Sequence, residues 1–175
     1  MAFLLDMVRL RPWFSAALFI AFAAAGTILG AFFFEYGMGL APCPLCLQQR
    51  VPYYVVMPLA LGVAAAAFFK LPDTLVRLGL LVLAGVMIWG VYLGVYHAGA
   101  EWGFWPGPTT CAQPATIART PGDLLRQIQT GPRIADCTVA AWRFLGVSLA
   151  GWNVVIAAVL AGVALAGASR SRQAA

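Results

Sequence analysis

The chain has 175 residues, of which 62% are hydrophobic and only 10% are charged, whereas soluble domains carry about 25% charged residues. So few charges cannot cover the surface of a soluble domain, and a disordered chain would be poor in hydrophobic residues and rich in charge. The composition therefore excludes both classes and predicts a protein whose surface faces lipid.

Four long segments carry no charge, namely residues 12–34, 51–69, 78–100 and 144–169. Each approaches the roughly 20 apolar residues with which a helix crosses about 30 Å of hydrocarbon. They predict an all-α membrane protein, a four-transmembrane-helix bundle formed by one domain of residues 1–175. The predicted helices are about 13–34, 51–69, 76–96 and 145–167.

The first apolar segment follows Arg9 and Arg11, as a signal peptide would, but it stays apolar up to Phe34 and has no polar cleavage region. We therefore predict that it is the first transmembrane helix. Residues 36–49 are too short to cross a membrane, and residues 102–118 contain three prolines. These two segments are assigned to loops at about 35–49 and 98–143.

Basic residues near the helix ends predict the orientation. Both termini and the turn between the second and third helices share one side, which holds the basic residues Arg9, Arg11, Lys70, Arg77, Arg170 and Arg172. We expect this side to be cytoplasmic, and the two loops to face the other compartment. The net charge of +5 then reflects topology, and no basic patch with interleaved aromatic residues points to nucleic acid.

The long loop contains one segment with helical periodicity. In residues 121–129, Leu124, Leu125 and Ile128 fall on one face, and Gly131-Pro132 follows. This pattern predicts a short amphipathic helix at the membrane surface or at a partner-facing surface.

All four cysteines fall in the two loops on the non-cytoplasmic side. An even number of cysteines facing an oxidising compartment indicates two disulfides. A zinc ribbon would need two close pairs, whereas Cys111 and Cys137 are far apart in sequence. The single histidine also leaves a monomer without a bis-histidine haem site.

Cys43 and Cys46 form a Cys-x-x-Cys motif just before the second predicted helix. A helix N-terminus lowers the pKa of a thiol through its free N–H groups and its dipole, and Arg50, one turn after Cys46, would add a positive charge. This arrangement favours a redox-active pair. The alternative is a structural disulfide with Arg50 as an interface residue, but so short a loop restrains little chain.

Cys111 and Cys137 admit two readings. A disulfide between them would stabilise the loop by roughly 3 to 4 kcal/mol in the chain-entropy model, which is a sufficient structural purpose. The first pair lies on the same side of the same small bundle, and exchange needs only that a thiolate reach a disulfide. That proximity favours a redox role.

The order of these features resembles the DsbB-type disulfide bond formation proteins of bacterial inner membranes. The resemblance rests on Ala-Pro-Cys43-Pro-Leu-Cys46-Leu-Gln-Gln-Arg50, on a histidine at the end of the third helix, and on Thr-Cys111 and Asp-Cys137 before Trp142 and Gly151-Trp152. It covers nearly the whole chain. Two departures stand out: Gln49 replaces an acidic residue found in some members, and the first helix has no ionisable residue that could relay protons.

The resemblance implies an enzyme that relays electrons through the pairs Cys43–Cys46 and Cys111–Cys137. A periplasmic thioredoxin-fold oxidase of the DsbA type would attack Cys111, Cys137 would pass the electrons to the first pair, and Cys46 would engage a membrane quinone, ubiquinone or menaquinone. Such an oxidase is a strong oxidant, with a reduction potential of about −120 mV, so its reoxidation needs a strong terminal acceptor.

Arg50 would hold a quinone oxygen, and His97 could donate to a quinone carbonyl or relay a proton. The alternative for His97 is an interface histidine wetted by lipid headgroups. Trp102, Phe104 and Trp105 fit an interface belt better than a cofactor site. The sequence assigns no role to Tyr53 and Tyr54, and it indicates that Trp142 and Trp152 anchor the start of the last helix.

Two other functions remain open at this stage. A quinone-linked reductase resembling vitamin K epoxide reductase also combines four helices with Cys-x-x-Cys, although its second pair fits this chain less well. A small transporter or assembly protein with structural disulfides is the other, but transporters usually carry a polar intramembrane site, and the four apolar segments hold no charge.

Overall fold

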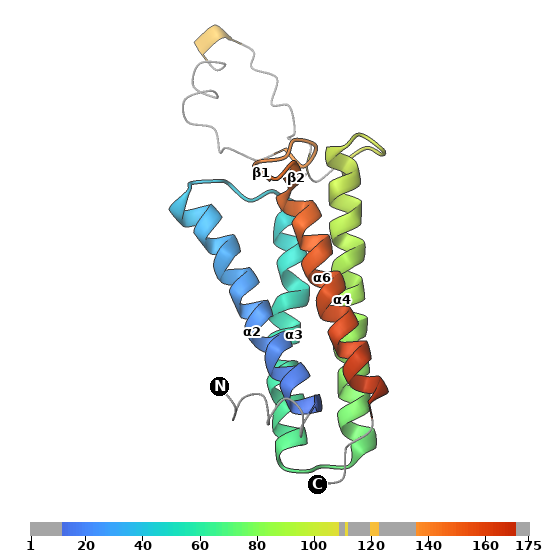
Figure 1. The fold of residues 1–175 in the computed structure, drawn as a ribbon. Helices are drawn as coiled ribbons and strands as arrows, with labels where there is room; N and C mark the ends of the chain where they lie inside the picture. Colours follow the sequence, from blue (N-terminus) through green and yellow to red (C-terminus); the bar gives the residue numbers. More distant parts are fainter. Residues whose placement is uncertain (1–11, 109–110, 112–119, 123–135, 171–175) are drawn as a thin grey trace.

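The computed structural model describes residues 12–108, 111, 120–122 and 136–170. Its long helices are α2 (Pro12–Phe32), α3 (Pro44–Phe68), α4 (Asp73–Glu101) and α6 (Leu149–Ser169). A π-helical turn, η1 (Phe33–Gly37), continues α2, and the short strands β1 (Arg143–Phe144) and β2 (Val147–Ser148) precede α6. The four helices run side by side, with the strands at one end of the bundle (Figure 1).

Each of these four helices is long and apolar enough to cross a membrane. The predicted four-helix membrane fold is therefore confirmed, and the chain is a multi-pass membrane protein. The packed faces use small residues that let the backbones approach closely. Buried alanines from all four helices line the bundle interior: Ala24, Ala60, Ala84, Ala157 and Ala164.

The helix ends differ from the predicted ones. The second spanning helix, α3, begins at Pro44 rather than at about residue 51, because proline suits the first turn of a helix and Cys43 caps it. The third, α4, extends to Glu101 rather than to about residue 96. As a result, part of each predicted loop is helical. Most of the amphipathic segment predicted at residues 121–129 lies outside the described residues.

The last spanning helix, α6, begins at Leu149 rather than at about residue 145, because a hairpin precedes it. Phe144 pairs with Val147, and the two turn residues have positive φ, 52° at Leu145 and 81° at Gly146, which matches a type I′ turn. Ser148 then caps α6 by accepting a hydrogen bond from the Gly151 N–H.

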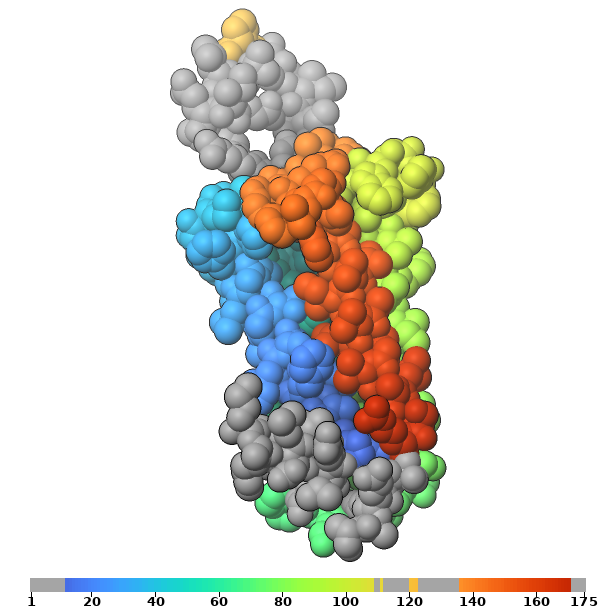
Figure 2. Space-filling model, in the orientation of Figure 1, coloured from blue at the N-terminus to red at the C-terminus, as the bar shows by residue number. Residues whose placement is uncertain are grey.

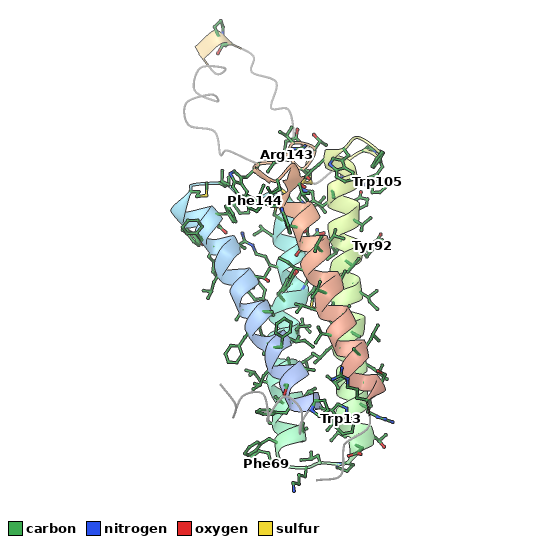
Figure 3. All side chains as sticks on the ribbon, viewed as in Figure 1. Trp13, Phe69, Tyr92, Trp105, Arg143 and Phe144 are labelled. Carbon is green, nitrogen blue, oxygen red and sulfur yellow. A yellow bond between two sulfur atoms is a disulfide. The ribbon has the colours of Figure 1, made fainter. Side chains whose placement is uncertain are left out.

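Aromatic side chains fasten this hairpin over the end of the bundle. The Trp152 indole donates to the Phe144 carbonyl, and the Trp142 ring lies 5.0 Å from Phe34, between ring centroids. The hairpin covers the bundle end between α2 and α4 (Figure 2). Figure 3 labels Arg143, Phe144 and Trp105 at this end, with Trp13 and Phe69 at the other. The predicted anchoring role of Trp142 and Trp152 agrees with these contacts.

Gly94 lies where α4 approaches α6 closely. A Cβ atom there would lie 2.8 Å from Val154 Cγ2 and 3.3 Å from the Val154 backbone nitrogen. We expect Gly94→Ala to destabilise the bundle by about 1–3 kcal/mol. Gly85→Ala, on the same helix but with open space around its Cβ, is expected to be neutral or slightly stabilising. Unfolding in detergent checks the pair, and equal stability of the two variants would contradict the close approach.

Candidate functional site: four cysteines at one end of the bundle

The fold brings the two cysteine pairs into one buried cluster. Cys43, Cys111 and Cys137 are 2%, 6% and 0% exposed, and Cys46 packs against them. Tyr96 on α4 closes another side of the cluster. Residues separated by most of the chain length thus meet where α3 begins, and thiol–disulfide exchange requires such contact.

Cys111 and Cys137 are joined by a disulfide, the pairing that the family resemblance implies. The neighbouring Asp136 carboxylate accepts hydrogen bonds from the Thr138 N–H and hydroxyl, at 2.8 and 2.9 Å. These hydrogen bonds lower the pKa of Asp136. The turn around Cys137 is therefore fixed by a carboxylate that stays ionised.

Cys43 and Cys46 are free thiols, which differs from the predicted Cys43–Cys46 disulfide. Their sulfurs lie 2.9 Å apart, with Cys43 Sγ donating to Cys46 Sγ, and the Cys46 N–H donates to Cys43 Sγ at 3.1 Å. The hydrogen bond with Cys46, together with burial, raises the pKa of Cys43. The structure thus holds the reduced form of the pair.

His97 is buried beside this pair, so the alternative of an interface histidine wetted by headgroups is wrong. It is 3% exposed, its Nε2 lies 3.5 Å from Cys43 Sγ, and its Nδ1 lies 2.5 Å from Gln49 Nε2. Gln49 is itself only 6% exposed. The amide therefore fixes the imidazole ring with one nitrogen directed at the buried sulfur.

Glu101 is a site residue that the sequence reasoning missed. Its Oε1 lies 3.8 Å from His97 Nε2, its side chain is 4% exposed, and its Oε2 has no hydrogen-bond partner among the described residues. The spacing of four residues between His97 and Glu101 on one helix was the available signal.

An open pocket of about 580 Å³ leads from the surface to Glu101. Trp105 and Thr138 line it, so it also borders the turn that carries Cys137. The Trp105 indole donates to the Tyr96 carbonyl, which holds the pocket wall against α4. Trp102 and Phe104 are exposed, and the interface belt assigned to them stays a prediction.

Arg50 lies on α3 one turn after Cys46, as predicted. Its guanidinium donates to Glu35 Oε2 at 2.6 Å, and the Phe32 ring centroid lies 5.4 Å away. Both partners come from the end of α2 and from η1. Sequence reasoning treated Glu35 only as the boundary of an apolar segment and missed this ion pair.

The two tyrosines after Arg50, Tyr53 and Tyr54, lie in different environments. Tyr53 is 1% exposed and donates to Asn153 Oδ1 at 2.6 Å, which ties α3 to α6. Tyr54 is exposed on the outer face of the bundle. Tyr53 is therefore part of the bundle's packing.

Sequence comparison with known proteins places the chain in a family. The family profile described as "Disulfide bond formation protein DsbB" matches residues 14–167. A disulfide bond formation protein B from Pasteurella multocida is 31% identical over 153 residues, covering 82% of this chain and 79% of the relative. Its counterpart from Xanthomonas oryzae is 30% identical over 159 residues, covering 86% and 87%.

A third relative, the disulfide bond formation protein B of Methylococcus capsulatus, is 29% identical over 141 residues and covers 75% of this chain and 79% of its own. No solved structure matches the chain. The profile match covers α3, α4, nearly all of α2 and α6, and all four cysteines. The chain therefore belongs to the DsbB family of disulfide bond formation proteins.

Proposed function

We propose that this protein reoxidises a periplasmic thioredoxin-fold oxidase of the DsbA type and passes the electrons to a membrane quinone. The observation that carries the proposal is the buried contact between a bonded pair, Cys111–Cys137, and a reduced pair at the start of a spanning helix. A structural staple would not need a second, reduced pair packed against it.

The first exchange takes place at the loop disulfide. A thiolate of the partner attacks Cys111, which forms a mixed disulfide and releases Cys137 as a thiolate. The second thiol of the partner then displaces Cys111, so the partner gains a disulfide and the Cys111–Cys137 pair gains two electrons.

The second exchange passes these electrons to the helix pair. When Cys43 and Cys46 are joined by a disulfide, the Cys137 thiolate attacks it within the buried cluster, and Cys111 completes the transfer. The product is the dithiol form that the structure holds. Cys46 is less buried than Cys43 and is therefore the sulfur that meets the electron acceptor.

The residues around Cys46 fit a quinone. Leu47 and Val51 are exposed on the lipid-facing side of α3, directly after Cys46 and Arg50, and provide an apolar surface. Arg50 supplies a charged donor for a carbonyl oxygen, and Glu35 holds that donor in position. When bound there, a quinone (ubiquinone or menaquinone) would supply the acceptor for the two electrons and two protons that Cys43 and Cys46 lose when they form a disulfide.

In this scheme His97 exchanges a proton with Cys43. At 3.5 Å from Cys43 Sγ, its Nε2 is close enough to exchange that proton as Cys43 closes the disulfide. Gln49 holds the opposite ring nitrogen, so the imidazole keeps this orientation through the cycle. Of the two roles expected of His97 from the sequence, this proposal keeps the proton relay and applies it to Cys43 instead of to a quinone carbonyl.

We further propose that the protein lies in the bacterial inner membrane, with both termini cytoplasmic and the cysteines facing the periplasm. The described ends of α2 and α6 meet at the opposite end of the bundle from the cysteines, where the Trp13 indole donates to the Arg170 carbonyl. Lys70 and Arg77 lie at that same end, in and after the α3–α4 turn (Figure 1). This distribution supports the positive-inside orientation.

A turnover assay tests the proposed function. Purified protein in detergent, mixed with excess reduced DsbA-type oxidase, is expected to oxidise at most two equivalents without quinone, because its four cysteines hold at most two disulfides. Added quinone is expected to permit many turnovers, with one quinone reduced per partner oxidised. Partner thiols and quinone absorbance are followed together. Oxidation that stays stoichiometric with both quinones would contradict the proposal.

A further inference from the structure

Cys43, Cys46 and His97 meet at one point beside the start of α3, and Glu101 lies next to His97. The sulfurs of Cys43 and Cys46 and a ring nitrogen of His97 all lie within 4.8 Å of one another. The Glu101 carboxylate follows at 3.8 Å from His97 Nε2. We propose that these four side chains form a binding site for a zinc-type divalent cation that exists only while Cys43 and Cys46 are reduced.

The ligand types and spacings suit such a cation. Bonds of about 2.3 Å to sulfur and about 2.0 Å to nitrogen, at a tetrahedral angle, place the two ligand atoms about 3.5 Å apart. Cys43 Sγ and His97 Nε2 are separated by 3.5 Å. The two sulfurs, at 2.9 Å, would have to separate to about 3.8 Å, which a change of side-chain torsion at Cys46 can supply.

Glu101 has no role in the proposed redox relay, although it lies beside His97. The Glu101 side chain is 4% exposed, and its Oε2 has no hydrogen-bond partner among the described residues, so this oxygen has room for a further ligand. A cation bound to the thiolates and to His97 would give this oxygen its partner. The pocket that Glu101 and Thr138 line provides an entry route from the surface.

Binding depends on the redox state because the cation needs both thiolates. The two thiols release their protons to solvent as the metal binds, and no electrons move. A disulfide between Cys43 and Cys46 would remove two of the four ligands. The bound cation would in turn occupy both sulfurs and block their oxidation until a chelator removes it, so zinc-type metals would inhibit the reduced enzyme reversibly.

Cadmium binding tests the site in the absence of partner and quinone, so its failure leaves the proposed function intact. The full chain carrying Cys111→Ser and Cys137→Ser is reduced, desalted without oxygen and titrated with Cd²⁺. We expect a sulfur-to-cadmium absorption band that saturates at one Cd²⁺ per chain and is reversed by Zn²⁺. The same protein with Cys43 and Cys46 oxidised should show no band.

Two carboxylate variants in that background separate the four-ligand site from a simple dithiol. Glu101→Gln is expected to weaken Cd²⁺ binding by at least about tenfold. Glu35→Gln, which also removes a largely buried carboxylate, is expected to leave the affinity unchanged because Glu35 pairs with Arg50. Cadmium-113 NMR of the Cys111→Ser, Cys137→Ser chain should report mixed sulfur, nitrogen and oxygen ligation. Absence of a saturable band, full affinity in Glu101→Gln, or a sulfur-only resonance would overturn the site.

Discussion

Replacing Cys43 and Cys46 together with serine is expected to lower quinone-dependent turnover by at least about 1,000-fold, because the pair that transfers electrons to the acceptor is gone. The Cys111–Cys137 disulfide should remain, because it involves neither of the replaced cysteines. The double variant should therefore oxidise one equivalent of the DsbA-type partner and then stop.

The single stoichiometric oxidation serves as the internal control for folding. A misfolded variant would lose the first exchange as well as the second, whereas the relay predicts loss of the second alone. The complementary variant, Cys111→Ser with Cys137→Ser, should reverse the pattern: it fails with the protein partner but still reduces quinone at the expense of a small dithiol. Partner thiols and quinone absorbance are measured in parallel. Sustained turnover in the Cys43→Ser, Cys46→Ser variant would refute the relay.

The fold was largely predictable because lipid imposes a simple demand on the sequence. Every residue that crosses hydrocarbon must be apolar or paired, so the gaps between charges marked the four spans. The helix ends were less predictable, because capping decides them. The Cys43 sulfur caps the N-terminus of α3, and Pro44 is its first residue. The Cys-x-x-Cys motif therefore lies at the first turn of the helix.

The site was predictable only along a single helix. The spacing of Cys46 and Arg50 on α3 could be derived from the helical period, and it holds in the structure. Contacts between helices could not be derived in this way. Gln49 meets His97 because α3 packs on α4, and Glu35 meets Arg50 because the π-helical turn carries α2 past its apolar segment.

Glu101 and Glu35 show that charges at the ends of apolar segments can be site residues as well as boundaries of the segments. Both were used only as boundaries, yet each is largely buried and faces a site residue: Glu101 lies beside His97, and Glu35 binds Arg50. A charge that close to hydrocarbon requires a partner or a function. The identity of that partner depends on the register between helices, which the sequence of one chain does not specify.

Loss of the Arg50 guanidinium is the second large effect that we expect. Arg50→Gln should raise the KM for quinone by about 10- to 100-fold, since hydrogen bonds to charged groups contribute about 1.5–3 kcal/mol. Arg50→Lys keeps the charge but loses the planar donor pair and should fall between Arg50→Gln and the parent protein. Steady-state kinetics with the reduced DsbA-type partner at saturation measure these changes.

Glu35→Gln is expected to raise the same KM by a smaller factor, because the guanidinium survives but loses its 2.6 Å partner and keeps only Phe32. In the double variant Glu35→Gln, Arg50→Gln, the loss of Glu35 should add nothing, since the residue acts through Arg50. Arg77→Gln provides the matched control: Arg77 lies 5.9 Å from the Trp13 ring centroid at the other end of the bundle, and its removal should leave the KM unchanged. Additive losses from Glu35 and Arg50 would show that Glu35 acts independently of the guanidinium.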